Sequence, residues 1–200
     1  MTVTDSGTVQ TRAATPRTSQ QETVPTRGAT PRTPQQETAD LTAADFRHAI
    51  GHFATGVTVV TSVGPDGEPV GTTANAVSSL SLDPPLILVC FDRASVTLDA
   101  IAAHGAFAVN VLAARQQHLS ANFARRGLTA AWDGVRHRPG LTGSPRLDGV
   151  LASLECTVEH RLDGGDHEIV VGRVHEVETG GAGGAPLLFW RGSYASLEVA

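Results

Sequence analysis

Apolar and polar residues follow one another along this chain in short blocks that predict many strands and few helices. Runs rich in β-branched and apolar residues, bounded by turn signals, predict strands at residues 57–63, 86–91, 106–112, 150–162, 168–178, 187–190 and 194–199. Pro65-Asp66-Gly67 predicts the turn of a hairpin over 57–71, and Asp163-Gly164-Gly165-Asp166 predicts a second hairpin. Hairpins and short helical links favour a mainly β fold, an antiparallel barrel with a few helices, over a doubly wound sheet.

Helical signals are fewer. Thr42 followed by Asp45 is a capping signature, and Phe46, Ile50 and Phe53 then form an apolar helical face that should end near residue 56. Two further helices are expected over 95–104 and 114–124. The Gly-, Arg- and Pro-rich stretch 125–147, which carries Trp132, predicts a long surface excursion of the kind that often covers a ligand.

The first forty residues differ in composition from the rest. A segment that starts at Thr11 is repeated from Thr26, and Thr, Pro, Gln and Arg dominate both copies. With so few large apolar residues, this segment cannot offset the entropy of ordering. We predict a disordered tail over 1–40, with a docking peptide as the alternative, and one domain over 41–200.

Charge and cysteine content narrow the function classes. The net charge of −5 argues against nucleic-acid binding, and the absence of Lys excludes Schiff-base chemistry. Cys90 and Cys156 lie in apolar runs without metal spacing, which fits a reducing compartment. No stretch is long enough for a membrane helix and no signal-peptide pattern starts the chain, so a cytoplasmic protein is expected. His48 and His52 have helical i, i+4 spacing, but a third ligand is not apparent, so no metal is expected.

The stretch from Gly71 to Phe91 is the most informative part of the sequence. Its first half is rich in hydroxyl and amide groups, which would need many partners if they were buried. It is also low in charge and bulk, which suits a backbone that lies close against a flat polar ligand. The second half, residues 86–91, predicts a strand buried on both faces. Together they indicate a cofactor site.

A helix start lies just after this strand. Ser95 is a suitable N-cap and Thr97 lies in the first turn, with Arg93 immediately before them. Free backbone N–H groups, two hydroxyls and a guanidinium would suit a phosphate, although a plain helix cap explains the same spacing. No GxGxxG follows a strand, so a nucleotide would be held differently from a Rossmann fold.

His167 follows the second predicted turn and precedes a strand, which places its ring at a barrel rim. Arg173 and Tyr194 would lie near it if the last strands pair, and an exposed turn histidine is the alternative. No nucleophile elbow or paired carboxylates indicate hydrolysis, so a cofactor would carry any reaction.

Seven ordered blocks resemble the flavin reductase domain family: FRHAIGHFATGVTVVTS, GTTANAVSSLSLDPPLILVC, SVTLDAI, FAVNVL, LSANFA, LASLECTVEH and GDHEIVVGRV. The match spans about residues 46–197. The resemblance implies a split β-barrel of the FMN-binding type, a homodimer with FMN or FAD near the subunit interface, and NADH or NADPH as hydride donor. It also implies hydride transfer from nicotinamide C4 to flavin N5, and release of reduced flavin to a separate monooxygenase.

The resemblance also assigns residues by position. The flavin ring or ribityl chain would lie beside Thr55, Gly56, Val57, Thr58, Thr72, Thr73, Ala74, Asn75, Ser78 and Ser79. Ser95 and Thr97 would hold the phosphate and Phe123 would lie close to the flavin. His167, with Tyr194, would contact the nicotinamide. Many relatives have an aromatic residue where Val77 stands, which puts flavin affinity in question.

Two alternatives stay open. A non-catalytic flavin- or haem-binding split-barrel module would bind cofactor without steady NAD(P)H turnover, and the GDH block argues against it. An oxidase of the same fold that acts on a pyridoxine-like phosphate should carry more Arg and Lys around its substrate.

Overall fold

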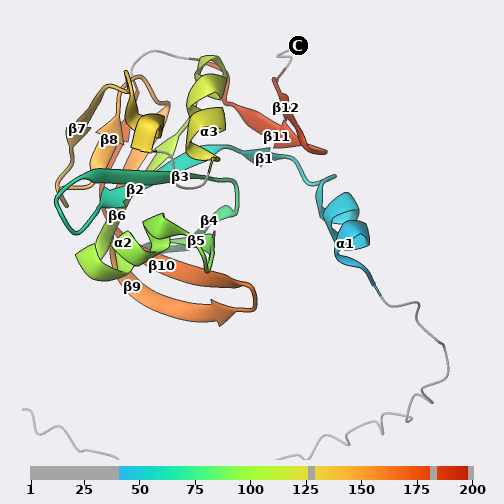
Figure 1. The fold of residues 1–200 in the computed structure, drawn as a ribbon, viewed down its shortest axis with the longest axis horizontal. Helices are drawn as coiled ribbons and strands as arrows, with labels where there is room; N and C mark the ends of the chain where they lie inside the picture. The colour runs from blue at the N-terminus through green and yellow to red at the C-terminus, as the bar shows by residue number, and fades with distance from the viewer. Residues whose placement is uncertain (1–40, 126–128, 181–183, 198–200) are drawn as a thin grey trace, which may run out of the picture. The chain divides into compact units, whose positions relative to one another are not determined.

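The computed structural model describes residues 41–125, 129–180 and 184–197. The tail predicted over 1–40, with its alternative as a docking peptide, lies outside these residues. Within them the fold is mainly β, as predicted, with short helices at the periphery (Figure 1).

The main sheet is antiparallel, and its seven strands among the described residues follow the order β3-β2-β6-β9-β10-β5-β4. Their bounds are β2 Thr58–Val63, β3 Pro69–Ala74, β4 Val77–Leu82, β5 Pro85–Asp92, β6 Ala106–Val111, β9 Ala152–Gly164 and β10 His167–Thr179. Both predicted hairpins are present, because β2 pairs with β3 and β9 pairs with β10. Smaller sheets contain β1 Thr55–Gly56, β11 Leu188–Trp190 and β12 Ser193–Ala195, and separately β7 His137–Pro139 and β8 Pro145–Leu147.

The two outermost strands of the main sheet, β3 and β4, are consecutive in the chain. Only Asn75 and Ala76 separate them, so one stretch of chain leaves one edge of the sheet and enters the other. The sheet therefore curls on itself, which is the geometry of a split barrel. Ala76 completes the crossing, because its carbonyl accepts a hydrogen bond from the Cys90 N–H over 3.0 Å.

The apolar side chains pack in two clusters. The first fills the curled sheet under α2 and consists of Val60, Ala74, Ile87, Val89, Phe91, Leu98, Ile101, Phe107, Val109, Cys156 and Val170. The second lies near α3 and consists of Val57, Val59, Leu112, Leu119, Phe123, Ala131, Leu147 and Leu187. β5 alternates between buried and half-buried positions, so it is fully buried on only one face and not on both as expected.

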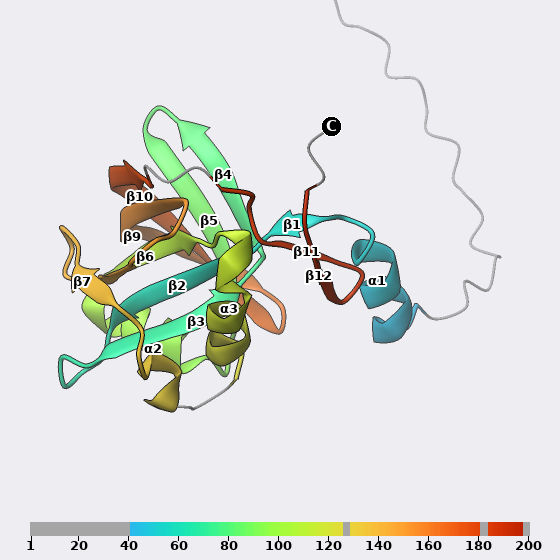
Figure 2. The same ribbon diagram turned by 90° about the horizontal axis from the view of Figure 1, so that it is seen from above.

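Helix α1 spans Ala43–Ile50, α2 spans Val96–His104 and α3 spans Gln117–Phe123 after a 3-10 turn at Ala114–Gln116. The predicted capping box of Thr42 and Asp45 is confirmed, with the Asp45 N–H donating to Thr42 Oγ1 over 3.2 Å. Gly51 caps α1, so the helix ends earlier than residue 56. None of its residues is buried, and Figures 1 and 2 show it beside β1, β11 and β12 rather than on the main sheet.

The stretch 125–147 is only partly the surface excursion that was predicted. A 3-10 turn, Thr129–Trp132, leads to β7 and β8, and Trp132 packs edge-on against Phe123 with ring centroids 4.9 Å apart. Residues 144–147 are buried, and Arg146 meets acidic groups there, among them Glu155 of β9. No helix among the described residues has the length and apolar character to cross a membrane.

Candidate functional site

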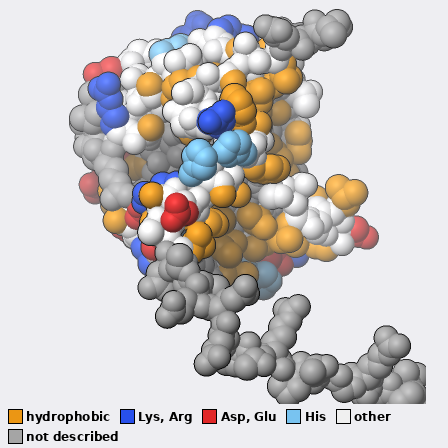
Figure 3. Space-filling view, turned by 90° about the vertical axis from the view of Figure 1, so that its right-hand side faces the viewer, with side chains coloured by type: hydrophobic (Ala, Val, Ile, Leu, Met, Phe, Trp, Pro, Cys, Tyr) orange, Lys and Arg blue, Asp and Glu red, His pale blue; other side chains and the backbone are white. Residues whose placement is uncertain are grey.

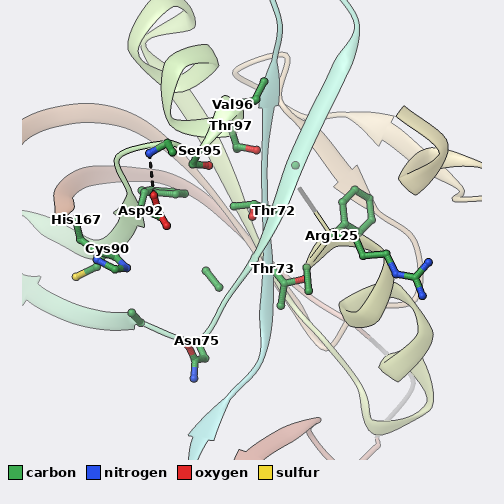
Figure 4. Close-up of a pocket in the computed structure, with 17 residues that line it drawn as sticks. Thr72, Thr73, Asn75, Cys90, Asp92, Ser95, Val96, Thr97, Arg125 and His167 are labelled. Carbon is green, nitrogen blue, oxygen red and sulfur yellow. Dashed lines mark hydrogen bonds between the residues drawn. The ribbon is translucent and has the colours of Figure 1, made fainter. Parts of the chain in front are cut away.

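A cavity of about 320 Å³ opens between β3, the end of β5, the start of α2, the end of α3 and the first residue of β10 (Figure 4). It is lined by Gly71, Thr72, Thr73, Ala74, Asn75, Ala76, Cys90, Phe91, Asp92, Ala94, Ser95, Val96, Thr97, Phe123, Ala124, Arg125 and His167. The hydroxyl-bearing strand and the helix start that the sequence singled out therefore share one cavity.

The start of α2 presents free donors to this cavity. Ser95 is the N-cap with extended backbone angles (φ −78°, ψ 119°), but its hydroxyl makes no capping hydrogen bond. Neither the Ser95 hydroxyl nor the buried Thr97 hydroxyl bonds to another described residue. A helix N-terminus carries partial positive charge and unsatisfied N–H groups. These hydroxyls are therefore available to an anionic group.

The opposite wall is the end of β3. Thr73 Oγ1 donates to the Ser120 carbonyl over 2.7 Å, which fixes the strand to α3. The Thr58 hydroxyl donates to the Ala74 carbonyl over 2.7 Å from beneath the wall. Asn75 Nδ2 donates to Thr55 Oγ1 over 3.3 Å, and this bond ties the crossing to β1. The wall is therefore a polar strand that is held in position by hydrogen bonds to α3, β2 and β1.

Gly71 allows a close approach at the inner end of the wall. A Cβ at this position would lie 3.2 Å from Phe123 Cε1 and 3.3 Å from the methyl group of Thr61. Phe123 is 2% exposed and is held between this strand and Trp132. An aromatic ring packed against the strand therefore lines this end of the cavity.

His167 stands at the rim, as its position after the turn predicted. Its Nδ1 lies 2.7 Å from Asp166 Oδ1, and this hydrogen bond lowers the pKa of the Asp166 carboxyl. Nε2 has no hydrogen-bond partner among the residues that the structure describes. Figure 4 shows His167 across the cavity from Thr73, so a ring bound between them would meet the imidazole.

Several lining residues were missed by sequence reasoning. Cys90 alternates with the buried positions of β5, and burial raises the pKa of its thiol. Asp92 accepts a hydrogen bond from the Ala94 N–H over 2.8 Å and so shapes the turn into α2. Arg125 lines the α3 side with its guanidinium directed away from the cavity (Figure 4). The uniformly apolar run 86–91 gave no signal for Cys90, because the alternation of buried and half-buried positions in β5 is visible only in the structure.

Other predicted site residues lie outside this cavity. They are Thr55, Gly56, Val57, Thr58, Ser78, Ser79 and Tyr194. Val57 and Thr58 are buried, and Ser78 and Ser79 lie exposed on β4. The hydroxyl of Tyr194 lies 2.9 Å from the hydroxyl of Ser120. Their assignments to flavin or nicotinamide stay predictions.

Two Arg residues have partners other than those expected. Arg93 was predicted beside the phosphate donors, but its side chain bonds to the turn between β9 and β10. Arg173 was predicted near His167, but it forms a bidentate pair with Glu159 over 2.7 and 2.9 Å. Neither prediction was correct, because the turn of the second hairpin engages the Arg93 guanidinium, and Glu159 on the neighbouring strand of the same hairpin engages that of Arg173. His48 and His52 stack edge-on, and no group of three metal-ligating side chains occurs among the described residues.

A curled, mainly β sheet with a polar cavity at the start of α2 is the architecture of a split barrel. Residues 50–198 match the model of the flavin reductase like domain. The chain belongs to this family, as its sequence blocks indicated.

Similar proteins carry related names. The chain is 45% identical over 162 residues to a flavin reductase (NADH) of Kitasatospora aureofaciens, covering 77% of this chain and 81% of that protein. It is 41% identical over 161 residues to the reductase subunit HsaB of a flavin-dependent monooxygenase of Mycobacterium tuberculosis (strain CDC 1551 / Oshkosh). That match covers 80% of this chain and 85% of the relative. A crystal structure of a nitrilotriacetate monooxygenase component B homologue from Mycobacterium thermoresistibile superposes with a TM-score of 0.74 at 44% identity. The superposition covers 78% of this chain and 86% of that chain.

Proposed function

We propose that this protein reduces FMN or FAD with a hydride from NADH or NADPH and supplies the reduced flavin to a separate monooxygenase. One observation carries the proposal. In a chain of the flavin reductase family, the polar strand β3 and the hydroxyl groups at the N-terminus of α2 line the same cavity. The names of the relatives support NADH as donor and a monooxygenase as partner.

The residues present fit a flavin. The cavity volume lies at the lower end of the range for small-molecule sites. Its phosphate end would be Ser95 and Thr97, where the helix start supplies partial positive charge without a fixed cation. Its ring end would be Thr72, Thr73 and Asn75, with His167 opposite. Modest affinity suits a ligand that has to leave after reduction.

The bound flavin supplies the hydride-accepting chemistry, so the chain needs no strong acid or base. Its own residues position the reactants, an effect that is worth roughly 7–11 kcal/mol in favourable cases. Backbone N–H groups along 72–75 would stabilise negative charge that develops on the ring. His167, oriented by Asp166, would contact the nicotinamide through its Nε2 edge. The two free cysteines support a reducing cytoplasm as the location.

A homodimer is part of the proposal. Figure 3 shows hydrophobic side chains gathered on the face that carries α1 in Figure 1. Phe46, Ile50 and Phe53 of this region are each more than half exposed. Apolar patches of this kind mark protein interfaces. Sedimentation of the full chain should show a dimer, and Phe46→Ser should shift it towards monomer; a wild-type monomer would contradict this part.

The central test is flavin-dependent loss of NADH or NADPH absorbance at 340 nm with purified protein and either flavin. Turnover is expected with at least one combination. Flavin binding without NAD(P)H consumption would instead support the non-catalytic module.

His167→Ala separates the two ligands. The variant should raise KM for NADH about fivefold to tenfold, as expected for a lost polar contact, and change the Kd for FMN by less than about twofold. His160→Ala, an exposed histidine on β9, is the matched control and should change neither. A larger effect on FMN than on NADH would reassign His167 to the flavin.

A further inference from the structure

The turn between β9 and β10 is held from outside by one residue. Every hydrogen bond that reaches residues 163–166 from beyond the hairpin comes from Arg93, among the residues that the structure describes. Arg93 Nε donates to the Gly165 carbonyl over 2.8 Å, and its terminal nitrogen donates to the Asp163 carboxylate. The Arg93 backbone N–H donates to the Asp166 carbonyl over 3.3 Å.

The topology makes Arg93 the last support of this turn. The ladder between β5 and β10 ends where Asp92 pairs with His167, so Arg93 is the first residue beyond it. Residues 160–166 are exposed. Beyond the end of the β5–β10 ladder, the strand pairing of this segment is only that between β9 and β10. Segments that open locally have few buried contacts, and their hydrogen bonds are exposed to solvent. The Arg93 side chain therefore contributes a large share of what fixes the turn.

We propose that Arg93 is a positioning residue that fixes this turn so that His167 faces the cavity. The consequence for nicotinamide binding rests on the proposed function. Gly165 adopts a positive φ of 80°, which directs its carbonyl to the guanidinium. Asp166, on the same turn, bonds to His167 Nδ1. Movement of the turn would therefore displace both the ring and the carboxylate that orients it.

A role in phosphate binding or in global stability fits Arg93 less well. Its guanidinium is already engaged with Gly165 and Asp163, and Glu168 Oε2 lies 3.8 Å away. The side chain is 45% exposed and that of Asp163 is 82% exposed, and pairs of this kind stabilise a fold little. Its effect should therefore be local to the turn.

The first test needs no ligand. Hydrogen–deuterium exchange of the full chain would follow peptides that cover 163–168 in the wild type, Arg93→Ala and Arg93→Lys. Exchange there should be at least about fivefold faster in Arg93→Ala, because the side-chain hydrogen bonds to Gly165 and Asp163 are both lost. Arg93→Lys should lie between, because a lysine keeps the charge but not the planar fork. Arg138→Ala, which removes a similarly exposed pair with Glu178, is the matched control and should leave the turn unchanged.

The second test separates the ligands. Arg93→Ala should raise KM for NADH about fivefold and change the Kd for FMN by less than about twofold. In the double variant with His167→Ala, the Arg93 change should add nothing, because it acts through His167.

Three results would overturn the proposal: unchanged exchange in Arg93→Ala, additive effects in the double variant, or an FMN effect as large as the NADH effect. A wild-type protein without flavin-dependent NADH oxidation would instead remove the proposed function. The exchange result would still support or overturn the role of Arg93 at the turn.

Discussion

Arginine–carboxylate contacts occur at both ends of the β9–β10 hairpin. The two groups of contacts differ in how deeply their side chains are buried. At the turn, Arg93 and Arg161 pair with Asp163 and Glu168, and both arginine side chains are more than 40% exposed. At the far end, the side chain of Arg146 is 5% exposed and faces Glu155, which is fully buried. The same chemistry therefore has different consequences: position at one end, stability at the other.

The buried group is tightly packed. Arg146 Nε lies 3.8 Å from Glu155 Oε1 and donates to Ser153 Oγ over 3.0 Å, and its terminal nitrogens contact Glu176 and Glu178. Thr142 Oγ1 donates to the other Glu155 oxygen over 2.6 Å, whereas Glu155 Oε1 has no hydrogen bond among the described residues. Burial raises the pKa of Glu155, whereas the hydrogen bonds from Thr142 and, after them, the charge of Arg146 oppose that rise.

Arg146→Ala should have the largest effect on stability. It leaves Glu155 buried without its counter-charge, which typically costs about 3–5 kcal/mol of unfolding free energy. Urea denaturation at neutral pH would measure it. Arg136→Ala, whose 88% exposed side chain lies 3.9 Å from Asp148, is the control and should cost under about 1 kcal/mol. Equal losses in the two variants would remove the distinction between the ends of the hairpin.

Glu155→Gln sharpens the same comparison through pH. Because the folded-state pKa of Glu155 lies above its unfolded value of 4.5, the stability that this group contributes is present below the unfolded pKa. It is lost as pH rises through the folded pKa. The unfolding free energy of the variant should therefore rise relative to that of the wild type between pH 4 and pH 7, because glutamine carries no charge whose burial becomes unfavourable at the higher pH. Denaturation at both pH values would check this, and a relative loss at pH 7 would mean that Arg146 outweighs burial.

Arg161→Ala tests the exposed end and should have the smallest effect. Its guanidinium donates to Glu168 and holds the pKa of that carboxyl below its usual range. Since the arginine is 41% exposed, the loss should be about 0.2–1 kcal/mol in the same denaturation assay. A loss as large as that of Arg146→Ala would show that exposure does not decide the outcome.

Local signals accounted for most of the fold. The capping box at Thr42, the two hairpin turns and the apolar runs of the strands depend on residues close together in sequence, and the structure contains them. The common cavity of Thr73 and Ser95 was also predicted, because a polar strand and a helix start flank the same buried strand.

Tertiary pairing explains what the sequence did not predict. Arg146 lay in a stretch interpreted as surface, and nothing local to it indicates that Glu155 is buried against it. Arg93 stands two residues before Ser95, so proximity suggested the phosphate, but its partner Asp163 lies 70 positions later in the sequence. Tyr194 of β12 pairs with Phe189 of β11, and its hydroxyl lies 2.9 Å from that of Ser120, a contact that the sequence did not predict.

The crossing at Asn75 and Ala76 places both borders of the main sheet on one uninterrupted peptide. A break in the main chain at this crossing would uncouple the two outermost strands of the sheet from each other, and exposed strand edges invite intermolecular pairing. A break in the turn at Pro65–Gly67 would leave these two strands joined. Tolerance to proteolytic nicking should therefore differ sharply between two sites only ten positions apart, and a ligand seated across the crossing would protect the more vulnerable one.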